Sequence, residues 1–219
     1  MLRMVRPRVE TCDVKMLTHC IELSRYATSQ GENPFACVIC HKDQIVVEAT
    51  TRAKRDADVT RHAEIIAISE AQKRLGTRDF PNCTIYSTVE PCAMCSFCIR
   101  ETGIGRVVYC IPSPIMGGVS KWNILGDSDI SDVLPEVFHK PPEIVSGLME
   151  TEAEQVWREW HPIDWAILRH RRAIGKSFPS ETGGADTLSP KRRLWDGLLS
   201  WIRPVKANQP SSHVDGRPA

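Results

Sequence analysis

At 219 residues, the chain is long enough for one α/β domain with a sizeable core and a short appendage. Its 28 Lys and Arg against 27 Asp and Glu give no overall charge of the kind that marks a dedicated nucleic-acid or membrane binder. No apolar run has the length of a signal peptide or a membrane span, so we expect a soluble, cytoplasmic protein.

Charge and cysteine content add two further indications. Residues 1–168 contain eighteen basic and twenty-three acidic side chains (net −5), whereas residues 169–219 contain ten and four (net +6). The two parts are therefore interpreted separately. Nine is an odd number of cysteines, and in a reducing compartment such residues are more often thiols or metal ligands than disulfides.

Apolar periodicity and turn signals divide most of the chain into alternating helices and strands. The predicted elements are a helix at 12–29, strands at 35–40 and 45–49, a charged loop at 52–60, a helix at 61–75, a strand at 84–89, a helix at 92–101, strands at 106–111 and 144–148, and a helical stretch at 151–172 interrupted at Pro162. Gly76 and Gly103 are helix-ending signals. Residues 112–142 are rich in Pro and Gly and predict a long functional loop. The alternation indicates an α/β fold with helices on both faces of a sheet.

The composition changes after Gly175. Residues 176–190 are rich in Ser, Pro, Gly and Thr, which is typical of a flexible linker. Residues 191–219 begin with Lys-Arg-Arg beside an amphipathic run and predict a basic, partly disordered tail that could dock on the domain, contact RNA or lie on a membrane surface. We therefore expect one domain over residues 1–175, followed by this linker and tail.

Two short clusters carry the chemistry. His62-Ala63-Glu64 and Pro91-Cys92-Ala93-Met94-Cys95 each open a predicted helix. One imidazole and two thiolates suit Zn²⁺ and leave the fourth tetrahedral position open, as in catalytic zinc sites. Zinc lowers the pKa of bound water to about 7, so hydroxide is available at neutral pH. Glu64 is the carboxylate placed to take the water proton and return it to a leaving amine.

The helix ends favour such a site but impose a geometric condition. The positive ends of the helix dipoles favour thiolate over thiol. However, positions 62 and 64 of an ideal helix point about 200° apart. His62 and Glu64 can serve one metal only if it lies beyond the helix end, where side chains of the first turn converge.

His-x-Glu followed by Pro-Cys-x-x-Cys resembles the zinc-dependent cytidine deaminase superfamily. The longer stretches 58–64 and 90–95, with Asn33-Pro34-Phe35-Ala36, resemble the branch of guanine deaminases, yeast-type cytosine deaminases and tRNA adenosine deaminases. The resemblance covers residues 12–170. It implies a three-layer α/β/α sandwich around a mixed sheet of about five strands, His62, Cys92 and Cys95 as zinc ligands, Glu64 as proton shuttle, and a homodimer.

The substrate contacts are less defined by this resemblance. Family members commonly carry an Asn about eleven residues before the metal His, and Thr51 stands there in this chain. A hydroxyl cannot make the paired donor and acceptor contacts of an amide. We expect substrate contacts from six residues: Phe35, Ala36, Thr51, Ala63, Glu90 and Trp122.

Other roles for these residues remain open. Either short motif alone could be a surface pair or a pair of buried thiols. Cys37 and Cys40 could join Cys92 and Cys95 in a closed four-thiolate zinc site, but residues three apart on a strand point to opposite faces. Cys98 could compete as a ligand or pack in the core.

The sequence thus predicts a zinc-dependent hydrolytic deaminase in which zinc hydroxide attacks the amino-bearing carbon of a nucleobase or nucleoside and ammonia leaves. Guanine, cytosine or a close analogue is the expected substrate. Adenosine in tRNA is the alternative, which the net charge of residues 1–168 disfavours because nucleic-acid affinity depends on phosphate neutralisation. An alternative of another class is a non-catalytic zinc-stabilised binding module, although a structural zinc would not need Glu64.

Overall fold

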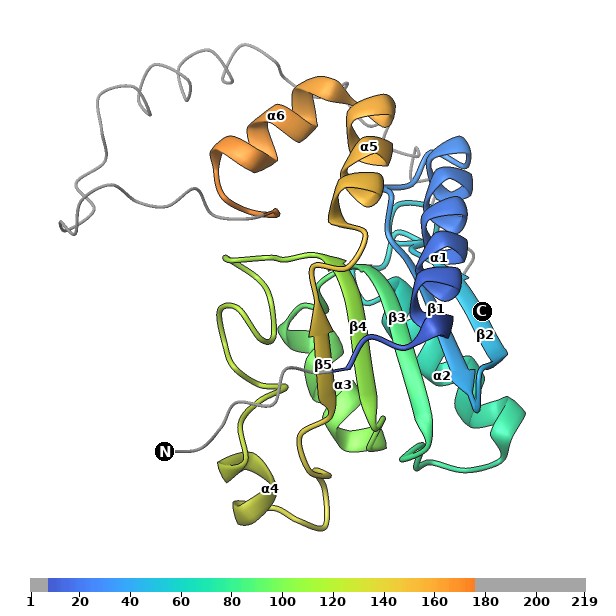
Figure 1. Ribbon diagram of the computed structural model, residues 1–219, viewed down its shortest axis with the longest axis vertical. Coiled ribbons are helices and arrows are strands. Elements are labelled where there is room, and N and C mark those ends of the chain that lie inside the picture. Colours follow the sequence, from blue (N-terminus) through green and yellow to red (C-terminus); the bar gives the residue numbers. More distant parts are fainter. Residues whose placement is uncertain (1–7, 176–219) are drawn as a thin grey trace, which may run out of the picture. The chain divides into compact units, whose positions relative to one another are not determined.

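The computed structural model describes residues 8–175, which fold as a sheet between two layers of helices (Figure 1). The elements in chain order are α1 (Thr11–Ser29), β1 (Ala36–His41), β2 (Gln44–Thr50), α2 (Ala63–Leu75), β3 (Cys83–Val89), α3 (Ala93–Thr102), β4 (Arg106–Ile111), α4 (Asp129–Val133), β5 (Glu143–Ser146), α5 (Glu150–Trp160) and α6 (Pro162–His170). The linker at 176–190 and the tail at 191–219 lie outside the described residues. No helix within 8–175 is long and apolar enough to cross a membrane.

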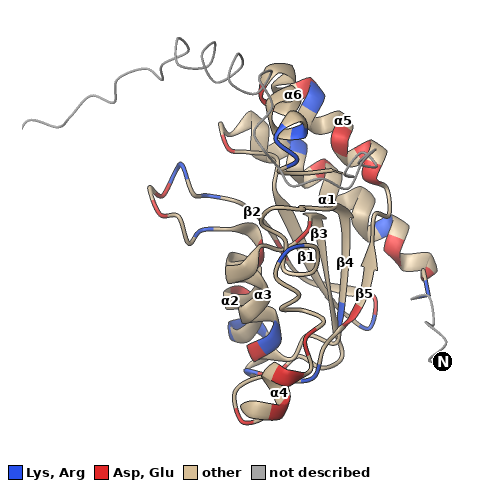
Figure 2. Ribbon diagram, turned by 90° about the vertical axis from the view of Figure 1, so that its left-hand side faces the viewer, with Lys and Arg blue, Asp and Glu red and all other residues tan. Residues whose placement is uncertain are grey.

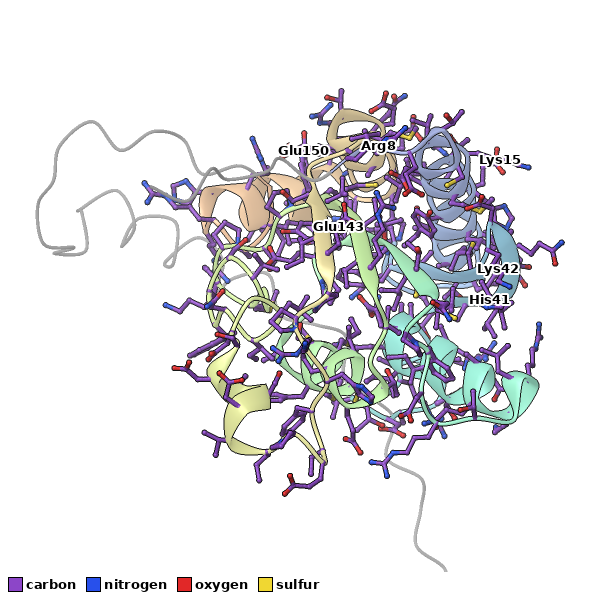
Figure 3. All side chains as sticks on the ribbon, turned by 60° about the horizontal axis from the view of Figure 1, so that its bottom comes forward. Arg8, Lys15, His41, Lys42, Glu143 and Glu150 are labelled. Carbon is purple, nitrogen blue, oxygen red and sulfur yellow. The ribbon has the colours of Figure 1, made fainter. Side chains whose placement is uncertain are left out.

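The five strands form one mixed sheet in the order β2-β1-β3-β4-β5. β1 pairs antiparallel with β2 and with β3, whereas β3, β4 and β5 run parallel. Lys42 and Asp43 have φ of 49° and 63°, the left-handed conformation that a two-residue hairpin turn requires. His41 and Lys42 lie at the tip of this hairpin (Figure 3). The predicted hairpin and mixed five-stranded sheet are confirmed.

Helices cover both faces of the sheet. α2 and α3 lie on one face, and α1 and α5 lie on the other (Figure 2). Alternating residues of β1 enter the two cores: Val38 and Cys40 pack with α1 and α5, whereas Cys37 and Ile39 pack with α2. The predicted three-layer α/β/α sandwich is therefore confirmed.

A buried ion pair joins two elements of the α1 face. Arg106, on β4, donates to both carboxylate oxygens of Asp13, on α1, at 2.6 and 2.8 Å. The Asp13 side chain is fully buried and the Arg106 side chain is 8% exposed. The Tyr86 hydroxyl also donates to Asp13 at 3.0 Å. These bonds hold α1 against the centre of the sheet.

Most element boundaries differ from the prediction by one or two residues, and one helix was not predicted. α2 begins at Ala63 rather than Arg61. The segment 112–142, predicted as loop throughout, contains the five-residue helix α4. The predicted interruption of the last helical stretch at Pro162 is confirmed, because Pro162 opens α6 at a position where its missing N–H is not needed.

Candidate active site

Two neighbouring helices place their N-terminal residues together. α2 has His62 as its N-cap (φ −71°, ψ 150°), and α3 has Cys92 as its N-cap (φ −70°, ψ 174°). Cys95 lies in the first turn of α3 and is fully buried. The Nδ1 atom of His62 is 3.5 Å from the Sγ atoms of both cysteines, and the two Sγ atoms are 3.6 Å apart. The three strongest metal donors of the two motifs thus meet at one point.

These separations fit a tetrahedral zinc ion. Zinc lies about 2.3 Å from a thiolate sulfur and about 2.0–2.1 Å from an imidazole nitrogen. At tetrahedral angles these lengths put nitrogen and sulfur about 3.6 Å apart and two sulfurs about 3.8 Å apart. The separations of 3.5 and 3.6 Å are close to those values. This group of three donors leaves one tetrahedral position for a molecule other than protein.

On an ideal helix His62 and Glu64 would point in nearly opposite directions, and the backbone at the start of α2 removes this conflict. Since His62 is an extended N-cap, it precedes the first turn and the helical angle between positions 62 and 64 does not apply to it. Glu64 lies in the first turn, and its Oε2 is 3.6 Å from the Sγ of Cys95. The site lies beyond the helix end, as the sequence required.

The Glu64 carboxyl group is held in an environment that favours its neutral form. The residue is buried, and burial is the main reason why the pKa of Glu64 is raised above its ordinary value. Ser87, on β3, donates to the Oε1 of Glu64 at 3.1 Å. A raised pKa makes the Glu64 carboxylate a better proton acceptor than an ordinary glutamate.

The cysteine and histidine side chains are polarised by one another. Hydrogen bonds from Cys95 and His62 lower the pKa of Cys92 to about 4, despite its burial. The same contact with Cys92 raises the pKa of His62. The lowered pKa favours the thiolate form of Cys92, which is the state that binds a metal, whereas contact with Cys92 raises the pKa of the Cys95 thiol.

A cavity of about 140 Å³ opens beside this group. At about 10–15 Å³ per water, it has room for roughly ten water-sized atoms, the size of one heterocyclic base. The predicted residues Phe35, Thr51, Ala63 and Glu90 line it, together with His62, Glu64 and Cys92. The structure thus brings two of the three metal donors, Glu64 and four of the six expected substrate contacts to one cavity.

Two of the expected substrate contacts do not line this cavity. Ala36 is fully buried at the start of β1, where its N–H donates to the Thr88 hydroxyl at 3.2 Å. Trp122 is 56% exposed, and the Lys121 ammonium lies 5.6 Å from its ring centroid. Trp122 is thus on the surface rather than at the metal-binding group.

Two of the lining residues have polar groups that are already engaged. The Thr51 hydroxyl donates to the Arg61 carbonyl at 3.1 Å, so only its lone pairs remain for a ligand. Both carboxylate oxygens of Glu90 accept hydrogen bonds from the loop 113–120. Glu90 therefore contacts protein in the manner we expected it to contact substrate.

The other cysteines do not join the metal group. Cys37 and Cys40 are buried on opposite faces of the sheet. Within the described residues, the group that contains Cys92 and Cys95 includes neither of them nor Cys98. Cys98 packs against the core on the α2 side. The four-thiolate arrangement is therefore absent from the part of the chain that the structure describes.

Several lining residues were not predicted. They are Glu32, Asn33, Ala53, Lys54, Val89, Ser113, Met116 and Ile174. Ser113 and Met116 belong to the segment 112–142 that was predicted to be a functional loop. Ile174 follows α6 and reaches the cavity because Gly175 N–H donates to Pro112 O at 2.7 Å. No local motif marks Ile174, since its position depends on a contact with a residue 62 positions earlier.

Comparison with known proteins gives a consistent set of relatives. Residues 10–111 match the model of the family described as the cytidine and deoxycytidylate deaminase zinc-binding region. The "Probable cytosine deaminase" of Schizosaccharomyces pombe is 31% identical over 185 residues, which are 84% of this chain and 93% of that protein. A tRNA-specific adenosine deaminase of Agrobacterium fabrum is 31% identical over 147 residues, 65% of this chain and 92% of that protein.

The fold also matches a solved structure. A guanine deaminase from Nitrosomonas europaea superimposes with a TM-score of 0.54 at 22% identity, covering 71% of this chain and 87% of that one. At this identity the likeness concerns the fold. It agrees with the mixed sheet and the helices on both of its faces.

Proposed function

The chain belongs to the cytidine and deoxycytidylate deaminase family of zinc-binding deaminases, which are hydrolases acting on C–N bonds, and from that premise we propose that it deaminates a free nucleobase or nucleoside. Guanine, cytosine or a close analogue is the proposed substrate. The observation that carries this proposal is the cavity of about 140 Å³, which adjoins both the His/Cys/Cys group and Glu64 and has the size of one base.

In this proposal His62, Cys92 and Cys95 hold the zinc ion. Their mutual distances fit its tetrahedral geometry, and the lowered pKa of Cys92 supplies a thiolate before the metal arrives. When bound, zinc supplies the Lewis acidity that brings the pKa of water to about 7. The dipoles of α2 and α3 add positive potential at the same point.

Glu64 carries the protons in this proposal. Its carboxylate takes one proton from water and delivers it to a ring nitrogen of the base. It then takes the second proton of the same water from the hydroxyl group newly bonded to the ring carbon and delivers it to the amino group, so that the C–N bond breaks, ammonia leaves and a carbonyl remains. The hydrogen bond from Ser87 orients the carboxylate for both transfers. The overall change consumes one water and replaces an amino group by an oxygen.

The remaining lining residues hold the ring and keep bulk water away. Phe35, Val89, Met116 and Ile174 give the cavity apolar walls that suit the faces of a planar base. Phe35 packs edge-on against Trp157 with ring centroids 5.2 Å apart, so its position is fixed by the core. Excluding water strengthens the electrostatic contacts of Glu64.

Adenosine in tRNA is the second candidate substrate. One observation favours it: the loop between β2 and α2 carries Arg52, Lys54, Arg55 and Arg61 against two aspartates, and Lys54 lines the cavity. Cationic side chains beside a base-sized cavity suit a phosphate backbone. A base-sized cavity suits a base in either form, whereas the net charge of residues 1–168 favours the smaller substrates.

The proposal is tested by ammonia release. Wild type and Glu64→Gln are assayed with guanine, cytosine, adenine, their nucleosides and a tRNA anticodon stem-loop, and zinc content is measured in both. Glu70→Gln, the same change at a partly exposed site on α2, is the matched control. We expect Glu64-dependent release from a free base or nucleoside, with zinc content equal in all three proteins. Release from the stem-loop alone would select tRNA, and zinc without release would contradict the enzymatic proposal.

A further inference from the structure

Glu90 directly follows β3 and lies two residues before Cys92. It is 3% exposed, and its carboxylate accepts four hydrogen bonds from the loop 113–120, here called the wall loop. Oε1 accepts the N–H groups of Val119 and Ser120 at 2.9 and 2.6 Å. Oε2 accepts the Ser113 N–H at 2.6 Å and the Ser120 hydroxyl at 2.5 Å. One side chain thus binds both ends of the wall loop.

This arrangement requires a carboxylate. Backbone N–H groups are obligatory donors, and each oxygen of Glu90 faces at least one of them. The amide of a glutamine has one acceptor oxygen and one NH₂ group that can only donate. Whichever way that amide is turned, its NH₂ group meets a backbone N–H and leaves it unsatisfied. An unsatisfied buried donor is unfavourable, and the loop would move away from it.

The wall loop approaches Glu90 too closely to carry side chains at its centre. A Cβ atom on Gly117 would lie 2.2 Å from the Glu90 carboxylate, and one on Gly118 would lie 1.8 Å from the Ser96 hydroxyl on α3. Gly118 N–H also donates to Pro91 O at 2.8 Å. The two glycines therefore let the backbone of the wall loop pack directly on the stretch that leads to Cys92.

The contacts of Glu90 extend to two walls of the cavity. The wall loop contributes Ser113 and Met116 to the lining. The Ser113 hydroxyl donates to Ala173 O at 2.9 Å, and Ile174 beside it is 2% exposed and lines the same cavity. Glu90 thus fixes Met116 through the wall loop and Ile174 through Ser113.

We propose that Glu90 is a positioning residue for substrate binding, which acts through the wall loop to set the distance between the Met116 and Ile174 walls. This inference rests on the proposed function. Glu90 touches neither Glu64 nor the metal donors through any of its four hydrogen bonds. Loosening the walls therefore weakens ground-state and transition-state binding equally, which raises KM and leaves kcat unchanged.

The test compares Glu90→Gln with wild type and with Glu101→Gln, the same change at a partly exposed site on α3. Zinc content, kcat and KM for ammonia release, and hydrogen exchange of the wall-loop amides are measured. We expect Glu90→Gln to keep its zinc and its kcat, to raise KM about tenfold and to speed exchange at Val119 and Ser120 at least about tenfold. Glu101→Gln is expected to match wild type.

The other outcomes separate this inference from the proposed function. If Glu90→Gln lowers kcat at unchanged KM, or leaves both KM and exchange unchanged, Glu90 does not position the walls. If Glu90→Gln does not fold, Ser120→Ala replaces it in the test, because this variant removes one of the four hydrogen bonds to Glu90. A KM raised about two- to threefold with normal zinc supports the role, and an unchanged KM overturns it. If wild type releases no ammonia, the proposed function fails, and hydrogen exchange still shows whether Glu90 holds the wall loop.

Discussion

Ser87 holds the Glu64 carboxyl group from a different element of the fold. Since its hydroxyl donates to Glu64 Oε1 at 3.1 Å, Ser87→Ala should leave that carboxyl group free to rotate away from the reacting atoms. We expect kcat to fall about tenfold, with KM and zinc content retained, in steady-state measurements of ammonia release. Ser87→Thr keeps the hydroxyl and should restore most of the lost kcat. A Ser87→Ala enzyme with the kcat of wild type would show that the hydrogen bond has no role in orientation.

In the proposed zinc site, Cys92 would couple metal binding to folding. Cys92→Ala removes one of three donors and the thiolate beside His62, so bound zinc and the free energy of unfolding should both decrease. Elemental analysis and urea unfolding measure the two quantities, and wild type treated with a chelator should unfold like the variant. Cys98→Ala, on the same helix but outside the donor group, is the matched control. Zinc content equal to that of wild type in Cys92→Ala would remove Cys92 from the ligand set.

The residues of the site differ in how far the sequence alone could identify them. His62, Glu64, Cys92 and Cys95 belong to two short contiguous motifs whose residue types carry the chemistry, so identifying them needs no knowledge of tertiary contacts. Glu90 belongs to one of these motifs, but the partners of its carboxylate lie 23 to 30 positions along the chain. Its hydrogen bonds therefore could not be read from the motif. Residue type predicts which hydrogen bonds a side chain can form, and the tertiary structure decides whether substrate or another part of the protein forms them.

At the scale of the elements, two helix ends offer a matched comparison. Gly76 ends α2 and Gly103 ends α3, both with φ of 64°. A Cβ on Gly76 would meet nothing within 4 Å, whereas one on Gly103 would lie 2.6 Å from the His139 ring. Gly76→Ala should lower the free energy of unfolding by about 1–2 kcal/mol, the cost of a left-handed conformation for a residue with Cβ.

Gly103→Ala should be less stable than Gly76→Ala. It carries the same backbone cost and must also displace the His139 ring, which pairs with Asp79 at 3.2 Å. Urea unfolding of both variants and of wild type measures the difference. We expect Gly103→Ala to lose about 1 kcal/mol more. Equal losses would mean that the His139 ring moves aside at no cost.

Most elements could be predicted because their signals are local. Glycines in the left-handed conformation end α2 and α3, and the polar turn at Lys42 and Asp43 joins β1 to β2. α4 was missed because five residues are too few for helical periodicity to appear. It lies in a segment held by tertiary contacts: the buried Arg100 donates to the carbonyls of Ile124 and Asp127 at 2.6 Å. Contacts of this kind leave no periodic pattern in the sequence.

At the scale of the whole domain, the sequence indicated which elements form the layers but not the contacts that join them. Alternation of helices and strands was sufficient for the α/β/α arrangement, since helices that bury one apolar face can cover both faces of strands that are buried on both sides. Asp13 and Arg106, in contrast, are 93 positions apart, and nothing in either local pattern indicates that they pair. Burial alone raises the pKa of Asp13, but the hydrogen bonds and the charge of Arg106 outweigh burial and lower it below its ordinary value. Because the pKa of Asp13 is lowered in the folded state, its ion pair with Arg106 stabilises the fold by an amount that depends on pH.

Asp13→Asn tests that contribution because it keeps the shape of the side chain and removes its charge. The buried Arg106 guanidinium then faces a neutral group at two of its contacts, and the exposed Glu143 carboxylate, 3.5 Å from its Nε, remains as an acidic partner. We expect the free energy of unfolding at neutral pH to fall by about 3–5 kcal/mol. Since the folded pKa of Asp13 lies below the unfolded value of about 3.9, the ion pair contributes fully above that pH and is lost as the pH falls through the folded pKa. The difference between wild type and Asp13→Asn in urea unfolding should therefore be constant from neutral pH to about pH 5 and shrink at lower pH. Asp132→Asn, the same change at an exposed position on α4, should unfold like wild type at every pH. If the loss of unfolding free energy in Asp13→Asn does not change with pH, the packing of the Asp13 side chain, and not its charge, holds α1 on the sheet.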